Sequence, residues 1–339
     1  MRTGPTQNHS TIVSVLILYW NNASHVRHCL DCLAKQTLKN FEVVVVDNGS
    51  VDNMNILPQD KQEDLILLTE KLETNKGFAA ANNIGARRAR GKWLALLNAD
   101  AFPEPDWLEK LLRAAEENPE FTFFSSRQIQ TSAPELLDGA GDSYHITGLA
   151  WRRYYNKLVK EYGYQVEEVF SACPAAALYA REEFLKVGGF DEDYFSYFED
   201  VDLGFRLRLG GAKCLYVPEA VVHHVGSAST GKRSDFSVYY GYRNMIWTFV
   251  KNMPSPLIWI YLPLHISAIL FFAFYLTLRG QGKVIWKAIF DAVRGLSKMI
   301  EKRKAIQKNK KIKTSELLRI MSTGLFEPFQ EFMLRNKSK

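Results

Sequence analysis

The amino-acid sequence predicts an α/β fold with a doubly wound, mostly parallel sheet, followed by membrane-associated helices. Three short apolar runs, at residues 12–19, 41–46 and 93–97, each end in a cluster of polar side chains. Segments of helical periodicity separate these runs, and this alternation is typical of parallel sheets whose ligands bind beyond the carboxyl ends of the strands. Residues 257–278 then form an apolar stretch without a formal charge, and a basic tail follows it.

The first half of the sheet is expected from three strands and two helices. Residues 12–19 are rich in β-branched side chains, which suits a strand buried on both faces. A helix that starts near Asn22 or Ser24 follows, because apolar side chains recur there at helical spacing. A second helix is expected at residues 78–90, between the second and third strands.

The second half of the chain has a less regular pattern. The aromatic, glycine-rich stretch 138–164 has no clear period, so we expect a strand-and-loop excursion there. Around it we expect helices at 105–118, 181–187 and 201–209, strands at 175–179 and 213–217, and a final segment at 221–229. We divide the chain into a first domain at residues 1–250 and a membrane-associated helical region at 251–339.

The C-terminal region has the composition of a membrane-associated segment. The apolar stretch 257–278 is 22 residues long, enough to cross a hydrocarbon core of about 30 Å, but Pro263 and His265 leave a kinked, re-entrant or in-plane segment open. Residues 279–339 carry 16 Lys and Arg against 5 Asp and Glu. A basic amphipathic helix, expected at 283–300, belongs at an anionic membrane surface. Its apolar face comprises Ile285, Ala288, Ile289, Ala292, Leu296 and Met299.

Composition and charge narrow the classes of function. The chain has 339 residues, 47% hydrophobic side chains and a net charge of +6, with the excess positive charge in the tail. A nucleic-acid enzyme is disfavoured, because the basic residues lie beside the apolar stretch and not beside the polar clusters at the strand ends. Four cysteines and a polar start without an apolar leader predict a reducing environment. We therefore expect the protein at the cytoplasmic face of the cell membrane.

Two of the polar clusters suit a divalent cation. Asp100 follows the third strand, and His223 and His224 follow a later apolar stretch. A cation held by carboxylate and imidazole groups stabilises a departing diphosphate as a Lewis acid. Each residue could instead have a purely structural role, since a carboxylate after a strand caps turns and a histidine there is commonly structural.

Two further clusters contain groups suited to base recognition and to general-base catalysis. Asp47 is placed to accept from the imide N–H of a pyrimidine base, and Tyr19 is placed to stack on its ring. Glu199 and Asp200 stand at the start of a helix among aromatic residues, and a partly dry pocket there would raise the basicity of a carboxylate. Turn capping and a charged first helical turn are the ordinary alternatives.

Taken together, the motifs resemble those of family 2 glycosyltransferases with the GT-A fold and are similar to those of bacterial rhamnosyltransferases. The resemblance covers residues 11–249 and implies an inverting transferase that uses a nucleotide-sugar donor. The matching motifs are VSVLILYWN at 13–21, VVVVDNGS at 43–50, NKGFAAANNIG at 75–85, LLNAD at 96–100, GGFDE at 188–192, FEDVDL at 198–203 and VVHHVGS at 221–227.

The resemblance also implies roles for individual residues. Asp200 resembles the catalytic base, with Glu199 beside it, and Asp100 resembles a metal ligand. The implied second metal ligand is His223, with His224 as the second choice. The implied donor-binding residues are Tyr19, Asn21, Asp47, Asn48, Asn75, Gly77, Asn83, Asn98 and Asp100, and the implied acceptor-binding residues are Gly189, Phe190, Asp191 and Glu199. One position departs from the family, because Asn98 replaces the first aspartate of the DxD motif and leaves the metal fewer charged ligands.

The expected reaction is transfer of a sugar, rhamnose or a related hexose, from a UDP- or dTDP-sugar to a lipid-linked or polysaccharide acceptor of the cell surface. Mg²⁺ or Mn²⁺ is the expected cofactor, the membrane surface is an expected partner, and a homo-oligomer remains open. The alternative is a non-catalytic, membrane-bound scaffold that binds nucleotide or glycan, and Asn98 motivates it. A dinucleotide-dependent oxidoreductase is disfavoured, because no GxGxxG turn follows the first strand.

Overall fold

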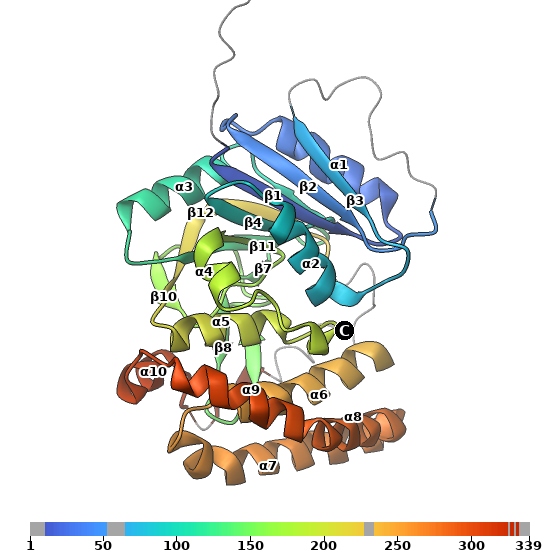
Figure 1. Ribbon diagram of the computed structural model, residues 1–339, viewed down its shortest axis with the longest axis vertical. Helices are drawn as coiled ribbons and strands as arrows, with labels where there is room; N and C mark the ends of the chain where they lie inside the picture. The colour runs from blue at the N-terminus through green and yellow to red at the C-terminus, as the bar shows by residue number, and fades with distance from the viewer. Residues whose placement is uncertain (1–10, 53–64, 227–233, 325, 329, 332–339) are drawn as a thin grey trace, which may run out of the picture.

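A twisted sheet with helices on both faces forms the upper part of the molecule, and a layer of helices forms the lower part (Figure 1). The computed structural model describes residues 11–52, 65–226, 234–324, 326–328 and 330–331. The strands of the sheet that position the site are β1 (Val13–Tyr19), β2 (Phe41–Asp47), β3 (Ile66–Lys71), β4 (Trp93–Asn98), β5 (Ala101–Pro103), β6 (Phe123–Gln130), β7 (Leu137–Gly139), β10 (Glu167–Val169), β11 (Ala176–Ala180) and β12 (Cys214–His224). The predicted α/β class is confirmed.

The order of the strands is β10-β12-β6-β11-β4-β1-β2-β3. β1 pairs in parallel with β2 and with β4, and β3 extends this parallel half beyond β2. β11 is antiparallel to both of its neighbours, β4 and β6. The mostly parallel sheet expected from the sequence is therefore confirmed for the N-terminal half, while the half beyond β4 is mixed. A separate hairpin joins β8 (Asp142–Tyr144) and β9 (Ala150–Arg152) in the irregular stretch.

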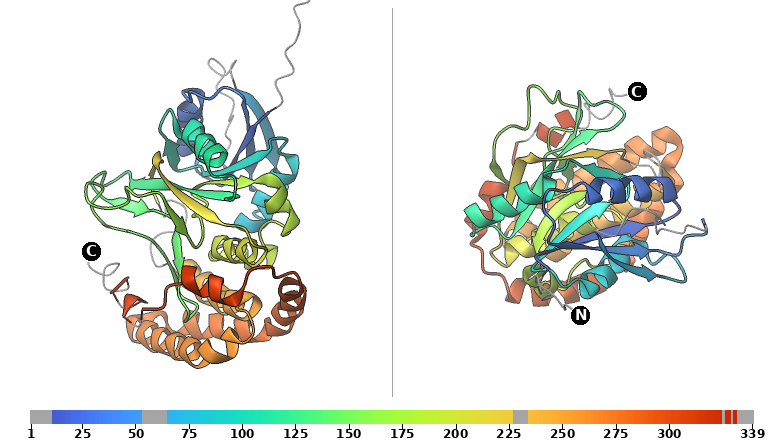
Figure 2. Two further views of the ribbon diagram at one scale, coloured as in Figure 1. Left: turned by 90° about the vertical axis from the view of Figure 1, so that its left-hand side faces the viewer. Right: turned by 90° about the horizontal axis from the view of Figure 1, so that it is seen from above.

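The sheet is covered on both faces, as a doubly wound fold requires. Side chains of β1 alternate, with Val15 and Ile17 in one apolar core and Leu16 in the other. The first core is closed by α1 (Ala23–Ala34) and α3 (Trp107–Glu117), and the second by α2 (Gly77–Arg88), α4 (Arg181–Lys186) and α5 (Glu199–Leu209). Figure 2 shows α1 and α3 on the upper side of the sheet, away from the C-terminal helices.

Several strands differ from the sequence prediction. The strand expected at 213–217 and the first four residues of the segment expected at 221–229 form one strand, β12, whose pairing with β6 shifts register between Val217 and Val221. Residues 227–229 of that segment lie outside the described residues. Pro218 lies in this irregularity, where its missing N–H costs no ladder hydrogen bond. β3 and β6 were not expected: β3 is an edge strand whose short apolar run, residues 65–68, stays half-exposed, and β6 carries the polar residues Ser125 to Gln128 in its middle.

The lower layer contains α6 (Asp235–Asn252), α7 (Leu257–Leu276), α8 (Gly282–Arg294), α9 (Leu296–Lys308) and α10 (Thr314–Ile320). The single helix predicted at 283–300 is wrong, because it is two helices that meet at Gly295. A Cβ at Gly295 would lie 2.5 Å from the ring of Trp247, whose Nε1 donates to the carbonyl oxygen of Ala292 at 2.9 Å. The close approach of this indole therefore requires glycine at the junction.

The helix α6 connects the two parts of the molecule. Its Phe249 shares an apolar cluster with Phe205 of α5, whereas its Met245 and Trp247 pack with residues of α8 and α9. The domain boundary predicted at residue 250 falls inside this helix. Within the described residues, one helical stretch, Leu257–Arg294, is long and apolar enough to cross a membrane. It consists of α7 and α8 joined by a short π-helical turn, η2 (Thr277–Gln281).

Candidate active site

The carboxyl ends of the parallel strands bring three of the predicted site residues to one edge of the sheet. Asp47 is the last residue of β2 and Asn98 is the last residue of β4, and these two strands flank β1. Asp47 pairs with Tyr19 of β1, and Asn98 pairs with the preceding residue, Leu18. Asp100 follows two residues after Asn98. Parallel pairing alone therefore places Asp47 and Asp100 on opposite sides of the end of β1.

The residues predicted to recognise the nucleotide base form hydrogen bonds that stabilise the loop after β2. The Asp47 carboxylate accepts from the backbone N–H of Ser50 at 2.8 Å, and the Asn21 side chain accepts from Val51 N–H at 2.8 Å. The Tyr19 hydroxyl donates to Asp52, and its ring is only 1% exposed. In this structure the Tyr19 ring is a core residue and offers no open face for stacking, whereas the half-buried Asp47 stays accessible.

A second polar network holds the first turn of α2 beside β2. The Asn48 amide donates to the Asn75 side chain at 2.9 Å and accepts from the backbone of Lys76 at 2.8 Å. Gly77 has a φ of 84°, and a Cβ at this position would lie 2.6 Å from the carbonyl oxygen of Phe195. Only glycine allows this contact. The predicted donor-side residues thus touch the segment that leads to Glu199 and Asp200.

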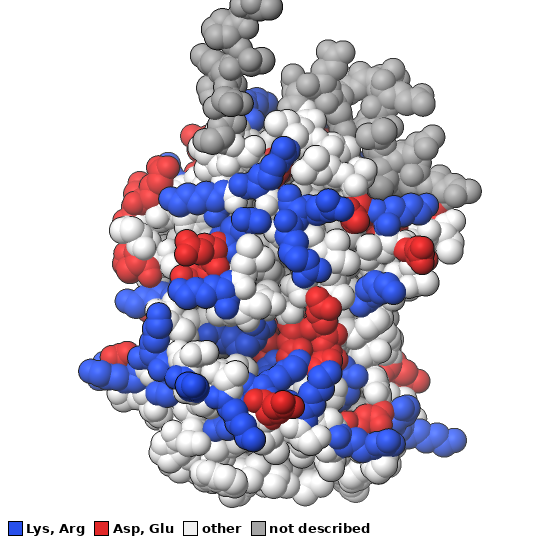
Figure 3. Space-filling model, in the orientation of Figure 1, with Lys and Arg blue, Asp and Glu red and all other residues white. Residues whose placement is uncertain are grey.

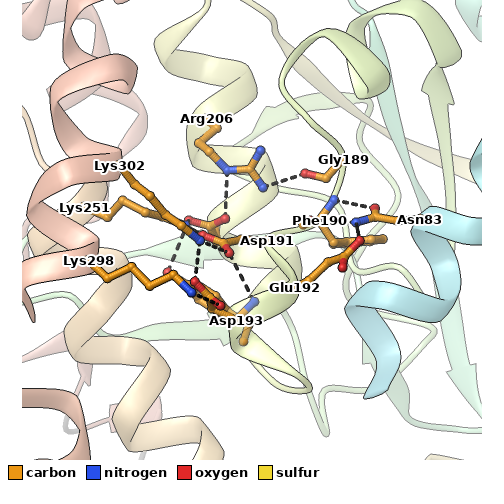
Figure 4. Close-up of polar contacts among 12 residues, drawn as sticks. Asn83, Gly189, Phe190, Asp191, Glu192, Asp193, Arg206, Lys251, Lys298 and Lys302 are labelled. Atoms are coloured by element: carbon orange, nitrogen blue, oxygen red, sulfur yellow. Dashed lines mark hydrogen bonds and ion pairs between the residues drawn. The ribbon is translucent and has the colours of Figure 1, made fainter. Parts of the chain in front are cut away.

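The predicted acceptor loop is anchored from several sides (Figure 4). Asn83 donates to the carbonyl oxygen of Phe190 at 2.8 Å and accepts from its N–H at 2.9 Å. Arg206 donates to the carbonyl oxygen of Gly189 at 2.7 Å. The Phe190 ring is 1% exposed and packs edge-on against Phe184, so it does not face open space. Asn83, Gly189 and Phe190 therefore shape the loop, and their side chains do not line an open pocket.

Asp191 belongs to an ionic cluster that reaches from the buried Lys251 to the exposed Lys298 and that we call the lysine clamp: Asp191, Asp193, Asp202, Lys251, Lys298 and Lys302 (Figure 4). Lys251 of α6 lies 2.5 Å from Asp191 and 2.7 Å from Asp202. Burial alone would raise the pKa of Asp191. The charges of Lys251 and Lys302 instead hold this pKa well below its usual value. The clamp ties the predicted acceptor loop to α6 and α9.

The predicted metal ligands Asp100 and His224 belong to a chain of contacts that starts at Asp100. The carboxylate of Asp100 lies 3.4 Å from His224 Nε2, and His224 Nδ1 donates to Asp138 of β7 at 2.7 Å. Arg152 of β9 pairs with the same Asp138 oxygen at 2.5 Å. Burial opposes a charge on His224, but the carboxylates of Asp100 and Asp138 outweigh it and raise the pKa of this imidazole to about 9.

The structure pairs His224, and not the first choice His223, with Asp100. Because side chains alternate along β12, His223 points to the other side, where its Nε2 lies 3.2 Å from Glu104. Its side chain, 37% exposed, lies in a shallow pocket with His28 and Phe102. The geometry thus favours His224 as the second metal ligand.

Asp100 and His224 fit a cation that is coordinated partly by the protein and partly by oxygen atoms of a diphosphate. Among the residues that the structure describes, no three His, Cys, Asp or Glu side chains are arranged to enclose a metal. A carboxylate and an imidazole together occupy part of a coordination shell and leave the rest to oxygen atoms of phosphates and water. The neutral Asn98, half-buried at the end of β4, adds an amide oxygen at the same edge.

Glu199 and Asp200 stand in the first turn of α5, after a strained aromatic segment. Phe195, Tyr197 and Phe198 all have φ between 64° and 66°, a conformation that costs energy for side chains of this size. Burial and the neighbouring Asp200 raise the pKa of Glu199 well above its usual value. Burial also raises the pKa of Asp200, although the Val201 N–H and the charge of Arg152 partly oppose this shift.

Arg152 links the two halves of the candidate site. It is hydrogen-bonded to Asp138, which holds His224, and its charge also acts on Asp200. A chain of contacts continues from Arg152 to the candidate base, because Asp142 pairs with Arg152 between β8 and β9, its backbone hydrogen-bonds to that of Ser171, and Ser171 Oγ donates to the carbonyl oxygen of Asp200 at 3.2 Å. Sequence reasoning missed Asp138 and Arg152, because both lie in a stretch without periodicity, and no local signal marks them.

Comparisons with known proteins identify the family and the fold of this chain. The family model described as "Glycosyl transferase family 2" matches residues 14–185. An N-acetylglucosaminyl-diphospho-decaprenol L-rhamnosyltransferase of Mycobacterium tuberculosis is 27% identical over 249 residues, which cover 65% of this chain and 78% of that protein. The O-antigen biosynthesis protein RfbC of Myxococcus xanthus is 30% identical over 234 residues, which cover 66% of this chain and 18% of that protein.

A solved structure shares the fold. The mannosyltransferase PcManGT from Pyrobaculum calidifontis, in complex with GDP-Man and Mn²⁺, superposes with a TM-score of 0.53 at 18% identity, covering 87% of this chain and 86% of that one. The matched regions span only 18% to 37% of the length of four curated relatives, the myxococcal protein among them. The sheet has the GT-A fold, and the chain belongs to glycosyl transferase family 2.

Proposed function

We propose that this protein transfers a sugar from a nucleotide-sugar donor to a lipid-linked or polysaccharide acceptor in cell-surface glycan synthesis, with inversion at the anomeric carbon. The observation that carries the proposal is the chain of contacts that runs from Asp100 through His224, Asp138 and Arg152 and continues through Asp142 and Ser171 to Asp200. One end of this chain of contacts suits a diphosphate and its cation, and the other end offers a carboxylate with raised basicity.

In the proposed reaction Asp200 takes the proton of an acceptor hydroxyl as its oxygen attacks the anomeric carbon. The bond between that carbon and the diphosphate breaks in the same step, and the nucleoside diphosphate leaves with the electron pair. Glu199, whose pKa is raised by burial and by the neighbouring Asp200, stands beside the base and is the proposed second contact of the acceptor hydroxyl. Asp100 and His224 would hold a divalent cation, whose chemistry is to neutralise the leaving diphosphate.

The nature of donor and acceptor is part of the proposal. Asp47 remains accessible at the end of β2 and is the proposed contact for a uracil or thymine base. A rhamnose-type sugar and a lipid-linked acceptor are proposed because the mycobacterial relative is named for rhamnose transfer to a diphospho-decaprenol-linked sugar. A cytoplasmic membrane location follows from the same kind of acceptor and from the apolar C-terminal helices.

A panel of nucleotide sugars tests the proposal. We expect purified full-length protein to release nucleoside diphosphate from one donor class when acceptor lipid extract is added, and we expect removal of divalent cations with EDTA to stop the release. Addition of Mn²⁺ or Mg²⁺ should restore it. The alternative function is a non-catalytic scaffold, which the neutral Asn98 favours. Binding of a nucleoside diphosphate without release from any donor in the panel would support that scaffold.

A further inference from the structure

We propose that α7 and α8 lie in the plane of an anionic lipid leaflet and do not span it. The outward side of α7 is apolar along its whole length, and eight large side chains of α7 and η2 are 41% to 72% exposed. They are Trp259, Ile260, Leu264, Ile266, Leu270, Phe271, Phe274 and Leu278. In Figure 3 the lower face of the molecule is largely free of Lys, Arg, Asp and Glu, and a belt of Lys and Arg lies above it.

The inward side of α7 is fixed to the rest of the protein. His265 donates from Nδ1 to the carbonyl oxygen of Thr147 at 2.7 Å, and its ring stacks on Phe249 of α6 with centroids 3.9 Å apart. Burial lowers the pKa of His265 to about 4, so the imidazole is neutral. Ile269 and Ala273 are buried on the same side. A helix that crossed a membrane would have to give up these contacts and expose His265 to lipid.

The turn after α7 is also inconsistent with a helix that crosses the membrane. Gly280 has a non-helical φ of 85°, so the chain bends there, and α8 packs mainly against α6 instead of continuing α7. Trp286, Phe290 and Val293 of α8 are exposed on one side of this helix. Three basic residues of α8 are also exposed, about a quarter turn around the helix axis from these apolar side chains: Lys283, Lys287 and Arg294. Apolar and basic strips side by side suit the boundary between acyl chains and phosphate groups.

Vesicle co-sedimentation of the full-length protein tests this inference without any enzymatic assay. We expect binding to vesicles of phosphatidylcholine with phosphatidylglycerol, weaker binding at high salt, and weaker binding to phosphatidylcholine alone. The double variant Phe271→Ser/Phe274→Ser should bind the anionic vesicles at least about tenfold more weakly, because two exposed rings no longer enter lipid. Ile66→Ser, which removes an exposed apolar side chain from the distant β3, should bind as the unmodified chain does.

Thiol labelling of vesicle-bound protein distinguishes the in-plane arrangement from a span. Ser255→Cys and Arg279→Cys place a thiol at an exposed polar position near either end of α7, and a membrane-impermeant reagent added outside should label both. Labelling at one end only would overturn the inference, as would unchanged vesicle binding of the Phe271→Ser/Phe274→Ser protein. Because neither assay needs a donor sugar, failure of the proposed transferase activity would not affect the result.

A second inference rests on a different observation, the buried carboxylate of Asp138. We infer that Asp138 is a positioning residue that orients His224 toward the cation. It is 5% exposed and accepts from His224 Nδ1, while Arg152 holds the same oxygen from the other side. This contact turns Nε2 of His224 toward Asp100. A carboxylate behind a ligating imidazole fixes its orientation and raises its affinity for a metal. The inference depends on the metal site of the proposed function.

Binding of Mn²⁺, measured by electron paramagnetic resonance in the presence of UDP, tests the role of Asp138. We expect Asp138→Ala to weaken Mn²⁺ binding by about 10- to 100-fold, and Asp138→Asn, which keeps an acceptor oxygen, to weaken it less. Glu104→Ala removes the carboxylate beside the neighbouring His223 and is the matched control, with unchanged Mn²⁺ binding expected. Equal Mn²⁺ affinity of the Asp138→Ala protein and the unmodified chain would refute the inference. If the unmodified chain bound no Mn²⁺, the proposed metal site itself would fail.

Discussion

Replacing Asp200 with Asn is expected to lower turnover by a factor of about 10² to 10⁴, because the acceptor hydroxyl then loses its proton acceptor. The substitution is nearly isosteric, and the amide oxygen of Asn can still accept from the Val201 N–H, which lies 2.8 Å from Asp200 Oδ1. The fold and the first turn of α5 should therefore survive. Steady-state release of nucleoside diphosphate, measured with the donor identified in the panel, gives the change in turnover.

Two measurements separate a catalytic role of Asp200 from a structural one. Binding of the nucleoside diphosphate should be unchanged, since Asp200 does not contact the donor side in the proposed mechanism. Activity of the unmodified chain should fall as the pH drops through the raised pKa of Asp200, and this acid limb should be absent from the residual activity of the variant. A variant that turns over as fast as the unmodified chain would remove Asp200 from the mechanism.

The donor side of the site was predictable because parallel strands align their carboxyl ends. Polar residues after each apolar run had to meet at one edge, and Asp47, Asn98 and Asp100 do so. The choice between His223 and His224 was not predictable in the same way. Both follow the same strand, and only the register of β12 against β5 and β6 decides which imidazole faces Asp100.

The residues that join the metal side to the candidate base could not be found from the sequence. Asp138 and Arg152 come from β7 and β9, two strands of three residues each, whose place is set by tertiary pairing and not by any local pattern. Gly295 illustrates the opposite case. Its sequence signal was present, since glycine disfavours a helix interior, but the apolar periodicity on both sides of it outweighed that signal.

The lysine clamp is the contact that most directly joins the lower helices to the predicted acceptor loop, and it was also invisible in the sequence. A lysine in the last turn of a helix ordinarily lies at the surface. The Lys251 side chain is instead 1% exposed, with Asp191 and Asp202 on either side and the ring of Tyr194 4.5 Å away. The position of the lower layer therefore depends on buried charges.

Replacing Lys251 with Met is expected to destabilise the protein by about 3 kcal/mol, the low end for breaking a buried ion pair, because Asp191 and Asp202 lose their shared cation and keep only Lys302 and Arg206. The midpoint of thermal unfolding should fall by on the order of 10 °C at neutral pH. Lys298→Met is the matched control. Lys298 pairs with Asp193 at 2.6 Å, but its side chain is 60% exposed, and a surface pair contributes about 0–1 kcal/mol.

The pH dependence of stability gives an independent test of the clamp. In the folded protein and despite burial, Lys251 and Lys302 lower the pKa of Asp191, and Arg206 together with Lys251 lowers the pKa of Asp202. Their stabilising effect is therefore complete above the usual pKa of an aspartate and is lost as the pH falls below it. In the Lys251→Met protein these folded-state pKa values move upward, so acidification from neutral pH should cost less additional stability than in the unmodified chain. Parallel stability–pH curves for the two proteins would show that the charge of Lys251 does not hold the clamp, and that this side chain stabilises the interface by packing alone.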